Sequence, residues 1–550
     1  MMKMLIFGIM LFLMSLFMIF NSLYLMMMNL DLFFEWNILS FNSMKMNMML
    51  YFNYKTLIYI FLVMFISSMI MIYSIDYMNI NNILIKRFYY LMMMFLFSMI
   101  ILIVSPNMLT IMLGWDMLGL TSYCLIIYFN KMSSFNSGMT TIILNRLGDV
   151  SLLMIISMMS AFGSWNLLIY KMDNMMMLMM IIMSITKSAQ FPFFVWLPMA
   201  MMAPTPVSSL VHSSTLVTAG IYLMIIYNNM MDLKYKNIIM LLSSITMLLS
   251  GLMANFEMDF KKIVAMSTLS QLGFMMSMLS MNMYELTFLH LFIHALFKSM
   301  MFMCVGSFIH YMKGMQNFRF YKGMFYIYPM KSMFIFMSLM MMCGFPFLVG
   351  FYSKDMMIES YMTISMNLFS FIMLMIGTIM TISYSMRIMK NLMSNNLNMK
   401  IVYNKESFIM NFVMMIMMLF MLFLSKIIHD LMFIIKNYNI MIVYKYFVFK
   451  MFLFGFMFMK FFDKLNFVNL LLLMKNMFYM INMFKLFKYK YFINLNNYSI
   501  NMEKMFIEKF LSNINMTILM LNKKFSLKVE MSIYSIMSMY MYFVFILIFY

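Results

Sequence analysis

The sequence predicts an all-α polytopic membrane protein with about fifteen transmembrane helices. Two features of the composition support this fold class, because 65% of the 550 residues are hydrophobic and only 10% are charged. A membrane-spanning helix needs about 20 apolar residues, and runs of that length follow one another along nearly the whole chain. The short alternating strands of a transmembrane β-barrel are not found in the sequence. We therefore expect helices that cross a lipid bilayer many times.

The apolar runs, taken in order, give the expected spans and the segments between them. The first run is too long for a signal peptide and lacks a small-residue cleavage site, so we treat it as a helix. Residues 27–54 are expected to form an external loop with some polar residues. The expected spans are 4–26, 55–77, 86–105, 107–130, 137–160, 174–197, 207–228, 235–254, 260–281, 284–307, 329–357, 362–388, 407–428, 439–459 and 531–549.

Residues 460–530 differ from the rest of the chain because they are rich in Lys and Asn. Within them, residues 501–521 carry apolar side chains at helical spacing, interspersed with charges. This pattern favours an amphipathic helix along the membrane surface or against partner proteins, and a solvated amphipathic loop is the alternative. The apolar run at 464–484 is punctuated by lysines, so we favour a surface segment over a further span.

Lysine and arginine side chains are distributed unequally between the two sides of the expected bundle. The net charge is +20, but most lysines lie between apolar runs and not on one basic face, which argues against nucleic-acid binding. With the N-terminus inside, the inside holds more of these residues, including the whole basic stretch 460–528. The positive-inside rule then predicts an N-terminus inside, a C-terminus outside and an odd number of spans.

The composition is biased in a way that protein physics does not require, with 98 Met, 61 Phe, 16 Gly and 7 Pro. Met, Phe, Ile, Asn and Lys share A/T-rich codons, so we interpret the bias as nucleotide drift in an organelle genome. Flexible methionine side chains pack tolerantly, which makes such drift structurally acceptable. Cys124, Cys304 and Cys343 lie singly in apolar runs and form neither a metal-binding spacing nor a disulfide framework.

One apolar run combines a lysine with a helix-breaking proline. Lys187 precedes Pro192, and further prolines follow before His212. An ammonium in hydrocarbon costs about 2.5–3.5 kcal/mol on insertion scales. Proline breaks a helix, and a bilayer tolerates the freed backbone groups only where protein or a water-filled cavity covers them. The combination indicates an ion path, and a lysine paired for assembly is the alternative.

A second run repeats this combination in reversed order, with Pro346 followed by Lys354 and Asp355. Two interrupted helices at corresponding positions in two halves of a chain are typical of inverted-repeat transport proteins. The reversal is what inversion of one repeat relative to the other would produce.

Carboxylates also occur within the apolar runs, where an unpaired charge is costly. Asp116 lies in the middle of an expected span and is a plausible partner for Lys187. Arg146 and Asp149 are spaced i,i+3, so they can pair on one helix. That second pair can serve local neutralisation as well as function.

A row of titratable side chains occupies one helix face, because His290, His294 and Lys298 are spaced i, i+4 and i+8. Two histidines at i,i+4 could bind a metal, but Glu285 points off this face and a lysine on the next turn repels a cation. We therefore expect no metal site and favour a proton relay, since histidine titrates near neutral pH. Buried histidines that bond neighbouring helices are the alternative.

Nothing in the sequence supports redox chemistry on this chain, which lacks nucleotide-binding loops, clustered cysteines and a soluble domain. Seven motifs occur in a fixed order, namely Leu113–Tyr123, Asn145–Asp149, Thr186–Pro192, Ala203–Gly220, Ser270–Gly273, His294–Lys298 and Gly344–Asp355. Together they resemble chain 5 of mitochondrial NADH–ubiquinone oxidoreductase, in particular its insect-type versions. That family is the distal of the antiporter-like subunits in the membrane arm of respiratory complex I.

The resemblance implies a proton path along residues of this chain, with Arg146, Asp149, Pro192 and Pro346 in supporting roles. Many family members have Glu where this chain has Asp116, and with the shorter carboxylate a water can lie between it and the lysine. By family pattern, Asp116 and Lys187 form the acid–lysine pair of the first half-channel, His212, His290, His294 and Lys298 the central polar axis, and Lys354 with Asp355 the exit side.

The resemblance also implies the domain organisation. It has 1–85 as N-terminal helices and external loop, 86–228 and 235–388 as two inverted five-helix antiporter-like repeats with broken helices, 407–459 as additional spans, 460–530 as a surface connection with a lateral amphipathic helix, and 531–550 as a terminal anchor helix.

By the same resemblance, the chain lies in the mitochondrial inner membrane with its N-terminus on the matrix side and its C-terminus on the intermembrane-space side. Its partners are the lipid bilayer and other membrane-arm subunits. The chain itself is expected to hold no cofactor, whereas NADH, FMN, iron–sulfur clusters and ubiquinone belong to the parent complex.

We predict a core membrane-arm subunit that translocates protons, coupled to electron transfer from NADH to ubiquinone in other subunits. A stand-alone cation/proton antiporter subunit is the first alternative, because such relatives share the motifs. A structural clamp, in which the buried charges serve assembly only, is the second.

Overall fold

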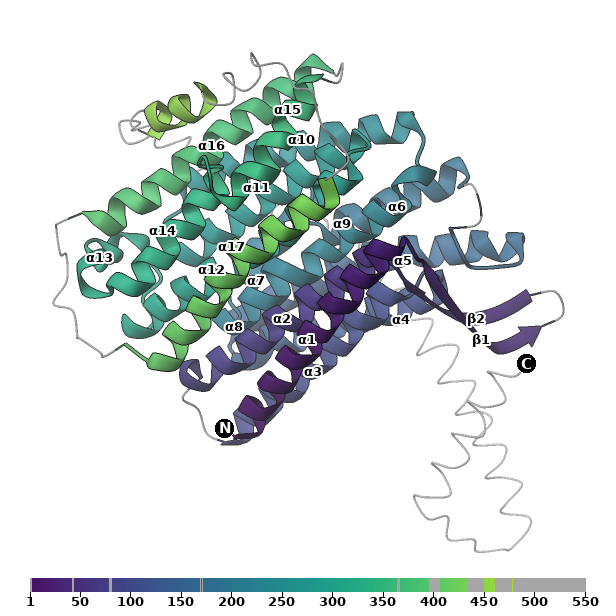
Figure 1. Cartoon of the computed structure of the whole chain (residues 1–550), viewed down its shortest axis with the longest axis horizontal. Coiled ribbons are helices and arrows are strands. Elements are labelled where there is room, and N and C mark those ends of the chain that lie inside the picture. The colour runs from purple at the N-terminus through teal and green to yellow at the C-terminus, as the bar shows by residue number, and fades with distance from the viewer. Residues whose placement is uncertain are drawn as a thin grey trace, which may run out of the picture. The chain divides into compact units, whose positions relative to one another are not determined.

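The computed structural model of the chain describes residues 2–41, 44–78, 82–168, 170, 172–363, 367–394, 406–433, 450–459 and 477, all within a unit of residues 1–478. The lateral helix predicted at 501–521 and the terminal anchor predicted at 531–549 lie outside the described residues. The described helices run side by side in a bundle (Figure 1).

The described part of the chain is almost entirely helical. The long helices are α1 (Met2–Met28), α2 (Tyr54–Tyr77), α3 (Asn82–Val104), α4 (Met108–Ile126), α5 (Met132–Met159), α6 (Asn174–Lys187), α9 (Leu216–Tyr227), α10 (Leu233–Phe256), α11 (Phe260–Ser280), α12 (Tyr284–Tyr311), α14 (Pro329–Cys343), α16 (Leu368–Met393) and α17 (Phe408–Phe433). Shorter pieces are η1 (Ile127–Phe129), η2 (Ser160–Phe162), η3 (Phe193–Val195), α7 (Trp196–Ala200), α8 (Thr205–Val207), η4 (Ser208–Thr215), η5 (Asn228–Met230), η6 (Phe318–Tyr321), α13 (Met324–Ile327), η7 (Phe351–Asp355) and α15 (Met356–Thr363).

Eleven of the described helical segments are long and apolar enough to cross a membrane. The other four expected spans do not appear as single long helices, for two reasons. The runs at 174–197 and 329–357 are each broken into shorter helices, the run at 439–459 is described only from residue 450, and the run at 531–549 is not described. The chain is thus a multi-pass helical membrane protein.

One part of the fold prediction was wrong, because the segment expected as an external loop contains an antiparallel hairpin of β1 (Leu32–Phe41) and β2 (Met44–Phe52). Its aromatic side chains stabilise the pairing, and the rings of Phe33 and Tyr51 stack with centroids 4.6 Å apart. The Asn107 side chain, which caps α4, donates a hydrogen bond to the Asn47 carbonyl at 2.7 Å. The hairpin is therefore bonded to the N-terminal end of α4.

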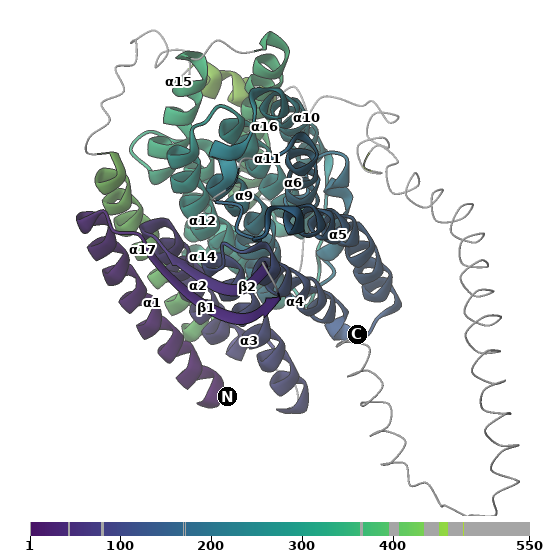
Figure 2. The ribbon, with the colours of Figure 1, turned by 90° about the vertical axis from the view of Figure 1, so that its right-hand side faces the viewer.

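The centre of the bundle is formed by α2, α11, α12 and the continuous run of α8, η4 and α9. All of these segments are buried over nearly their whole length. Helix α1 packs on α2 and lies beside α17 (Figure 2), where the rings of Phe12 and Phe420 meet at 5.9 Å. Helices α1, α4, α5 and α17 expose large apolar side chains outward, as a lipid-facing surface requires. The titratable row predicted on α12 consequently lies inside the protein and away from this surface.

Candidate functional site

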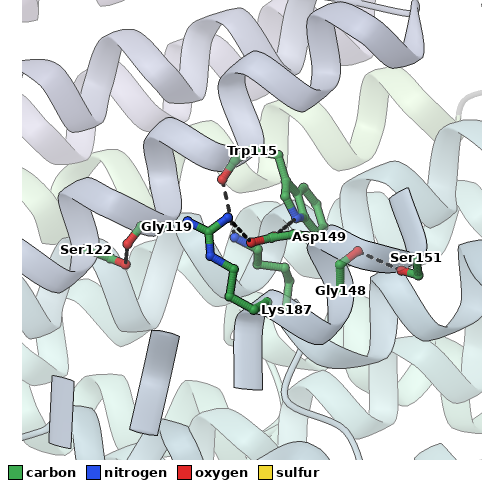
Figure 3. Close-up of polar contacts among 8 residues, drawn as sticks. Trp115, Gly119, Ser122, Gly148, Asp149, Ser151 and Lys187 are labelled. Atoms are coloured by element: carbon green, nitrogen blue, oxygen red, sulfur yellow. Dashed lines mark hydrogen bonds and ion pairs between the residues drawn. The ribbon is translucent and has the colours of Figure 1, made fainter. Parts of the chain in front are cut away.

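The first polar cluster lies between α4, α5 and α6, and Lys187 is at its centre (Figure 3). Lys187 is the last residue of α6 and is only 1% exposed. Its Nζ donates to the Trp115 carbonyl oxygen at 3.5 Å and lies 4.6 Å from the centroid of the indole ring. The ammonium is thus held by a backbone dipole and an aromatic face, two contacts that stabilise a cation away from water.

Asp149 is the carboxylate most closely tied to this lysine. It accepts a hydrogen bond from Trp115 Nε1 at 2.9 Å, and Arg146 Nη1 lies 3.3 Å from its other oxygen. Asp149 attracts Lys187 more strongly than Asp116 does. Within the described residues, no ion pair joins Lys187 to either Asp149 or Asp116. Both carboxylates therefore act on the lysine from a distance, and the half-buried Asp116 is the weaker of the two.

The backbone around Pro192 explains why helix α6 ends at Lys187. Helix α6 has 14 residues and reaches about 21 Å, short of the roughly 30 Å of a bilayer core. The chain then turns through Ala189 at φ +54° and passes Pro192 before η3 begins. One carbonyl freed by the break, that of Thr186, accepts a hydrogen bond from Trp196 Nε1 at 3.0 Å. The predicted break near Pro192 is therefore present, and protein groups satisfy it.

His212 lies in η4, a π-helical segment that follows the break, and is 1% exposed. Neither ring nitrogen has a hydrogen-bond partner among the described residues. The Trp196 ring meets the imidazole edge to face at 6.3 Å. The histidine is therefore enclosed by protein while its polar atoms stay available.

The three residues predicted on one face of α12 are all buried. The His290 and His294 ring centroids lie 6.4 Å apart. His290 bonds through Nδ1 to Ser353 Oγ at 3.0 Å and through Nε2 to Gln271 Oε1 at 3.3 Å, so it connects α12 to both η7 and α11. His294 has no hydrogen-bond partner within the described part of the chain.

Lys298 and Lys354 meet at the end of the second broken helix. Lys298 Nζ donates to Ser267 Oγ and lies 3.0 Å from the Met342 sulfur. Lys354 Nζ donates to the Met342 carbonyl oxygen at 3.3 Å and to Thr381 Oγ1 at 2.9 Å. Both ammonium groups are therefore held at one residue near the C-terminus of α14.

Asp355 lies next to this pair and is 7% exposed. It and Lys354 attract each other, although no ion pair shorter than 4 Å joins them in the described residues. The break itself is made by Gly344, whose φ of +80° ends α14 in the left-handed conformation that glycine favours. The second break accordingly begins two residues before Pro346.

Several side chains of this row were not predicted to take part, namely Trp115, Gln271, Ser353, Ser267 and Thr381. Three of them had a signal in the sequence, because Trp115, Gln271 and Ser353 lie in the family motifs. Ser267 and Thr381 are small hydroxyl residues of a kind common in membrane helices, and only the fold places them beside a charge. Across the described residues, no group of three or more His, Cys, Asp or Glu side chains is placed to hold a metal.

Comparison with known proteins defines the class first. A family model described as "NADH:quinone oxidoreductase/Mrp antiporter, TM" matches residues 105–381. The fold is shared with a chain of the Mrp complex from Dietzia sp., with a TM-score of 0.68 and 21% identity over 81% of this chain and 52% of that one. A chain of an archaeal membrane-bound sulfane sulfur reductase has the same TM-score at 16% identity, over 78% of this chain and 90% of its own. The chain is an antiporter-like membrane protein.

The particular family follows from closer relatives. A second family model, "NADH-Ubiquinone oxidoreductase (complex I), chain 5 N-terminus", matches residues 36–89. The chain is 55% identical to NADH-ubiquinone oxidoreductase chain 5 of Apis mellifera ligustica over 426 residues, which cover 78% of this chain and 77% of that one. It is 47% identical to the chain 5 protein of Aedes aegypti, over 68% of this chain and 66% of the relative. The chain belongs to the NADH-ubiquinone oxidoreductase chain 5 family and is a membrane subunit of that oxidoreductase.

Proposed function

We propose that this subunit translocates protons along the buried row from Lys187, through His212, His290, His294 and Lys298, to Lys354 and Asp355. The observation that supports the proposal most directly is that these titratable groups are buried in the centre of the bundle and not on its lipid-facing surface. Chains of such groups inside a membrane are typical of proton relays in pumps. The two lysines at helix breaks are the points where protons can be held.

The first half of the row works as an electrostatic switch. Lys187 faces Asp149, which is itself held by Trp115 and Arg146. Moving a carboxylate toward or away from a buried lysine changes the free energy of keeping the ammonium charged. Asp116 adds a second, more distant negative charge, so small helix movements would shift the proton between sites.

The wider setting belongs to the same proposal. We infer a bundle of about fifteen spans arranged as two inverted five-helix repeats in the mitochondrial inner membrane. The N-terminus lies on the matrix side, and the partners are other membrane-arm subunits of complex I. NADH, FMN, iron–sulfur clusters and ubiquinone are bound by those other subunits, and this chain contributes conduction alone.

Replacing the first lysine tests the proposal. Lys187→Met should abolish proton translocation coupled to NADH oxidation in the assembled complex, and Lys298→Met should do the same. Lys236→Met is the matched control. Lys236 lies near the start of α10 and is also buried, but it donates to Asn282, outside the row. Native gels would show that assembly is intact. Full translocation in both test variants would reject the conduction role.

A stand-alone cation/proton antiporter subunit is a second candidate, favoured only by the shared fold with the Mrp complex. The identity to chain 5 proteins is higher and argues for the oxidoreductase. Native gel migration with a very large assembly, as opposed to a small one, would decide between the two candidates.

A further inference from the structure

Among the described residues, His212 lacks the hydrogen-bond partners that a buried imidazole normally has. Its imidazole is buried, and neither nitrogen is bonded to a described residue. An unsatisfied buried polar group costs about 1–3 kcal/mol, and buried water commonly satisfies such groups. Water at His212 needs a way in, and the residues between it and the nearest end of the bundle provide one.

A pocket of about 330 Å³ lies at the end of the bundle where α2, η1 and α12 terminate. Its lining includes Tyr77, Phe129, His310 and Lys313. His310 is partly buried, and its Nδ1 has no hydrogen-bond partner in the described part of the chain. The pocket thus combines a titratable group with an opening toward the side of the membrane that is rich in lysine.

From this pocket, aromatic and hydroxyl groups continue inward. The His310 and Tyr77 rings lie 5.5 Å apart, and the Tyr77 and Tyr73 rings 5.7 Å apart. Both tyrosine hydroxyls interact with Thr205, the first residue of α8. Thr205 Oγ1 is buried and makes no hydrogen bond of ordinary geometry to the described residues. The Tyr73 hydroxyl donates to the Met303 carbonyl oxygen at 3.0 Å, so toward Thr205 it acts as an acceptor.

A glycine on α12 leaves the space for this junction. A Cβ added at Gly306 would lie 2.5 Å from Thr205 Oγ1 and 2.8 Å from the Tyr73 hydroxyl. Real Cβ atoms essentially never approach other atoms this closely. Helix α12 can therefore approach α8 and α2 only because residue 306 has no side chain.

The last step follows the chain from α8 into η4. Ser209 lies four residues after Thr205, and His212 lies three residues further along the same π-helical segment. Helices α2 and α12 both pack against α8 and η4, so this segment is enclosed by protein.

We propose that this set of residues is the aqueous entry route to His212, running from the pocket at His310 and Tyr77 to the Tyr73–Thr205 junction and along Ser209. The route deepens the proposed proton conduction and rests on it. Its occupant is water, and Gly306 sets its width.

Thiol accessibility tests the route without relying on pumping. Thr205→Cys in the assembled complex, in sealed vesicles, should react with a membrane-impermeant methanethiosulfonate ammonium reagent added on the Lys313 side. Thr218→Cys is the matched control, because Thr218 is equally buried but its hydroxyl is bonded to Tyr59 at 2.9 Å. We expect the first thiol to react at least roughly tenfold faster, equivalent to about 1.4 kcal/mol of barrier. Equal rates, or reaction from the opposite side only, would overturn the route.

A substitution that blocks the Tyr73–Thr205 junction tests the entry route separately from the conduction row. Gly306→Ala should lower proton translocation about tenfold, the factor given by about 1.4 kcal/mol of added barrier. Gly251→Ala is the control, since its added methyl would crowd Met380 at 2.9 Å but lies away from the pocket. If Lys187→Met abolishes translocation while Gly306→Ala leaves it intact, the route is wrong and the conduction row stands. Intact translocation in both would reject both.

Discussion

The indole of Trp115 offers a sharp test of the first polar cluster, because one side chain makes two separable contacts. Its ring faces the Lys187 ammonium at 4.6 Å, and its Nε1 donates to Asp149 at 2.9 Å. Trp115→Phe keeps an aromatic face and removes the donor. A hydrogen bond to a charged group contributes about 1.5–3 kcal/mol, so the charged carboxylate loses that much stabilisation.

This loss weakens the attraction that Asp149 exerts on Lys187. At about 1.4 kcal/mol for each factor of ten, we expect the rate of proton translocation to fall roughly 10- to 100-fold. The assay is proton uptake into vesicles that contain the assembled complex, alongside its electron-transfer rate.

A smaller ring also leaves unfilled volume, so a control for packing is needed. Trp165→Phe makes the same change at another buried indole, whose Nε1 donates to the Ile156 carbonyl at 3.2 Å away from the charges. Wild-type translocation in Trp115→Phe would refute the reasoning. A drop of equal size in Trp165→Phe would show that packing, and not the lost donor, is responsible.

Two further substitutions test the packing that positions the cluster. Gly148→Ala would place a Cβ 2.3 Å from Thr186 Oγ1, and overpacking of this kind costs about 1–3 kcal/mol. We expect a lower melting temperature of the purified complex, restored when Thr186→Ala is added, and no restoration would contradict the contact. Arg387 donates to the carbonyls of Asn255 and Glu257 at the C-terminal end of α10. Arg387→Gln should destabilise the complex by at least about 1.5–3 kcal/mol in thermal denaturation, with partial recovery in Arg387→Lys, and an unchanged melting temperature would exclude this capping role.

The sequence was sufficient to predict where most helices lie, because a bilayer imposes both length and composition on them. It also indicated both breaks, since proline and glycine are scarce in this chain and those present mark special backbone. The hairpin at 32–52 was missed because its strands contain apolar and aromatic residues without clear alternation. Strand pairing there depends on cross-strand contacts that a linear sequence does not reveal.

The candidate site was predictable as a set of residues but not as a set of contacts. Asp116 and Asp149 both lie within apolar helices, and the sequence cannot show which of them faces Lys187. That choice depends on how α4 and α5 are rotated against α6, which packing determines. The bonds of His290 to Gln271 and Ser353 likewise join three segments far apart in the chain. Sequence spacing places groups on one helix face, whereas only tertiary structure selects partners on other helices.

The two broken helices and the buried lysines have a common physical explanation. Lys187 is the last residue of α6, and Lys354 Nζ bonds to the Met342 carbonyl one residue before α14 ends. A helix C-terminus carries partial negative charge, which stabilises a nearby cation by up to about 2 kcal/mol when partly buried. This does not fully offset the roughly 2.5–3.5 kcal/mol cost of an ammonium in hydrocarbon. The helix end thus offsets part of the cost of each buried ammonium, and a nearby carboxylate lowers that cost further.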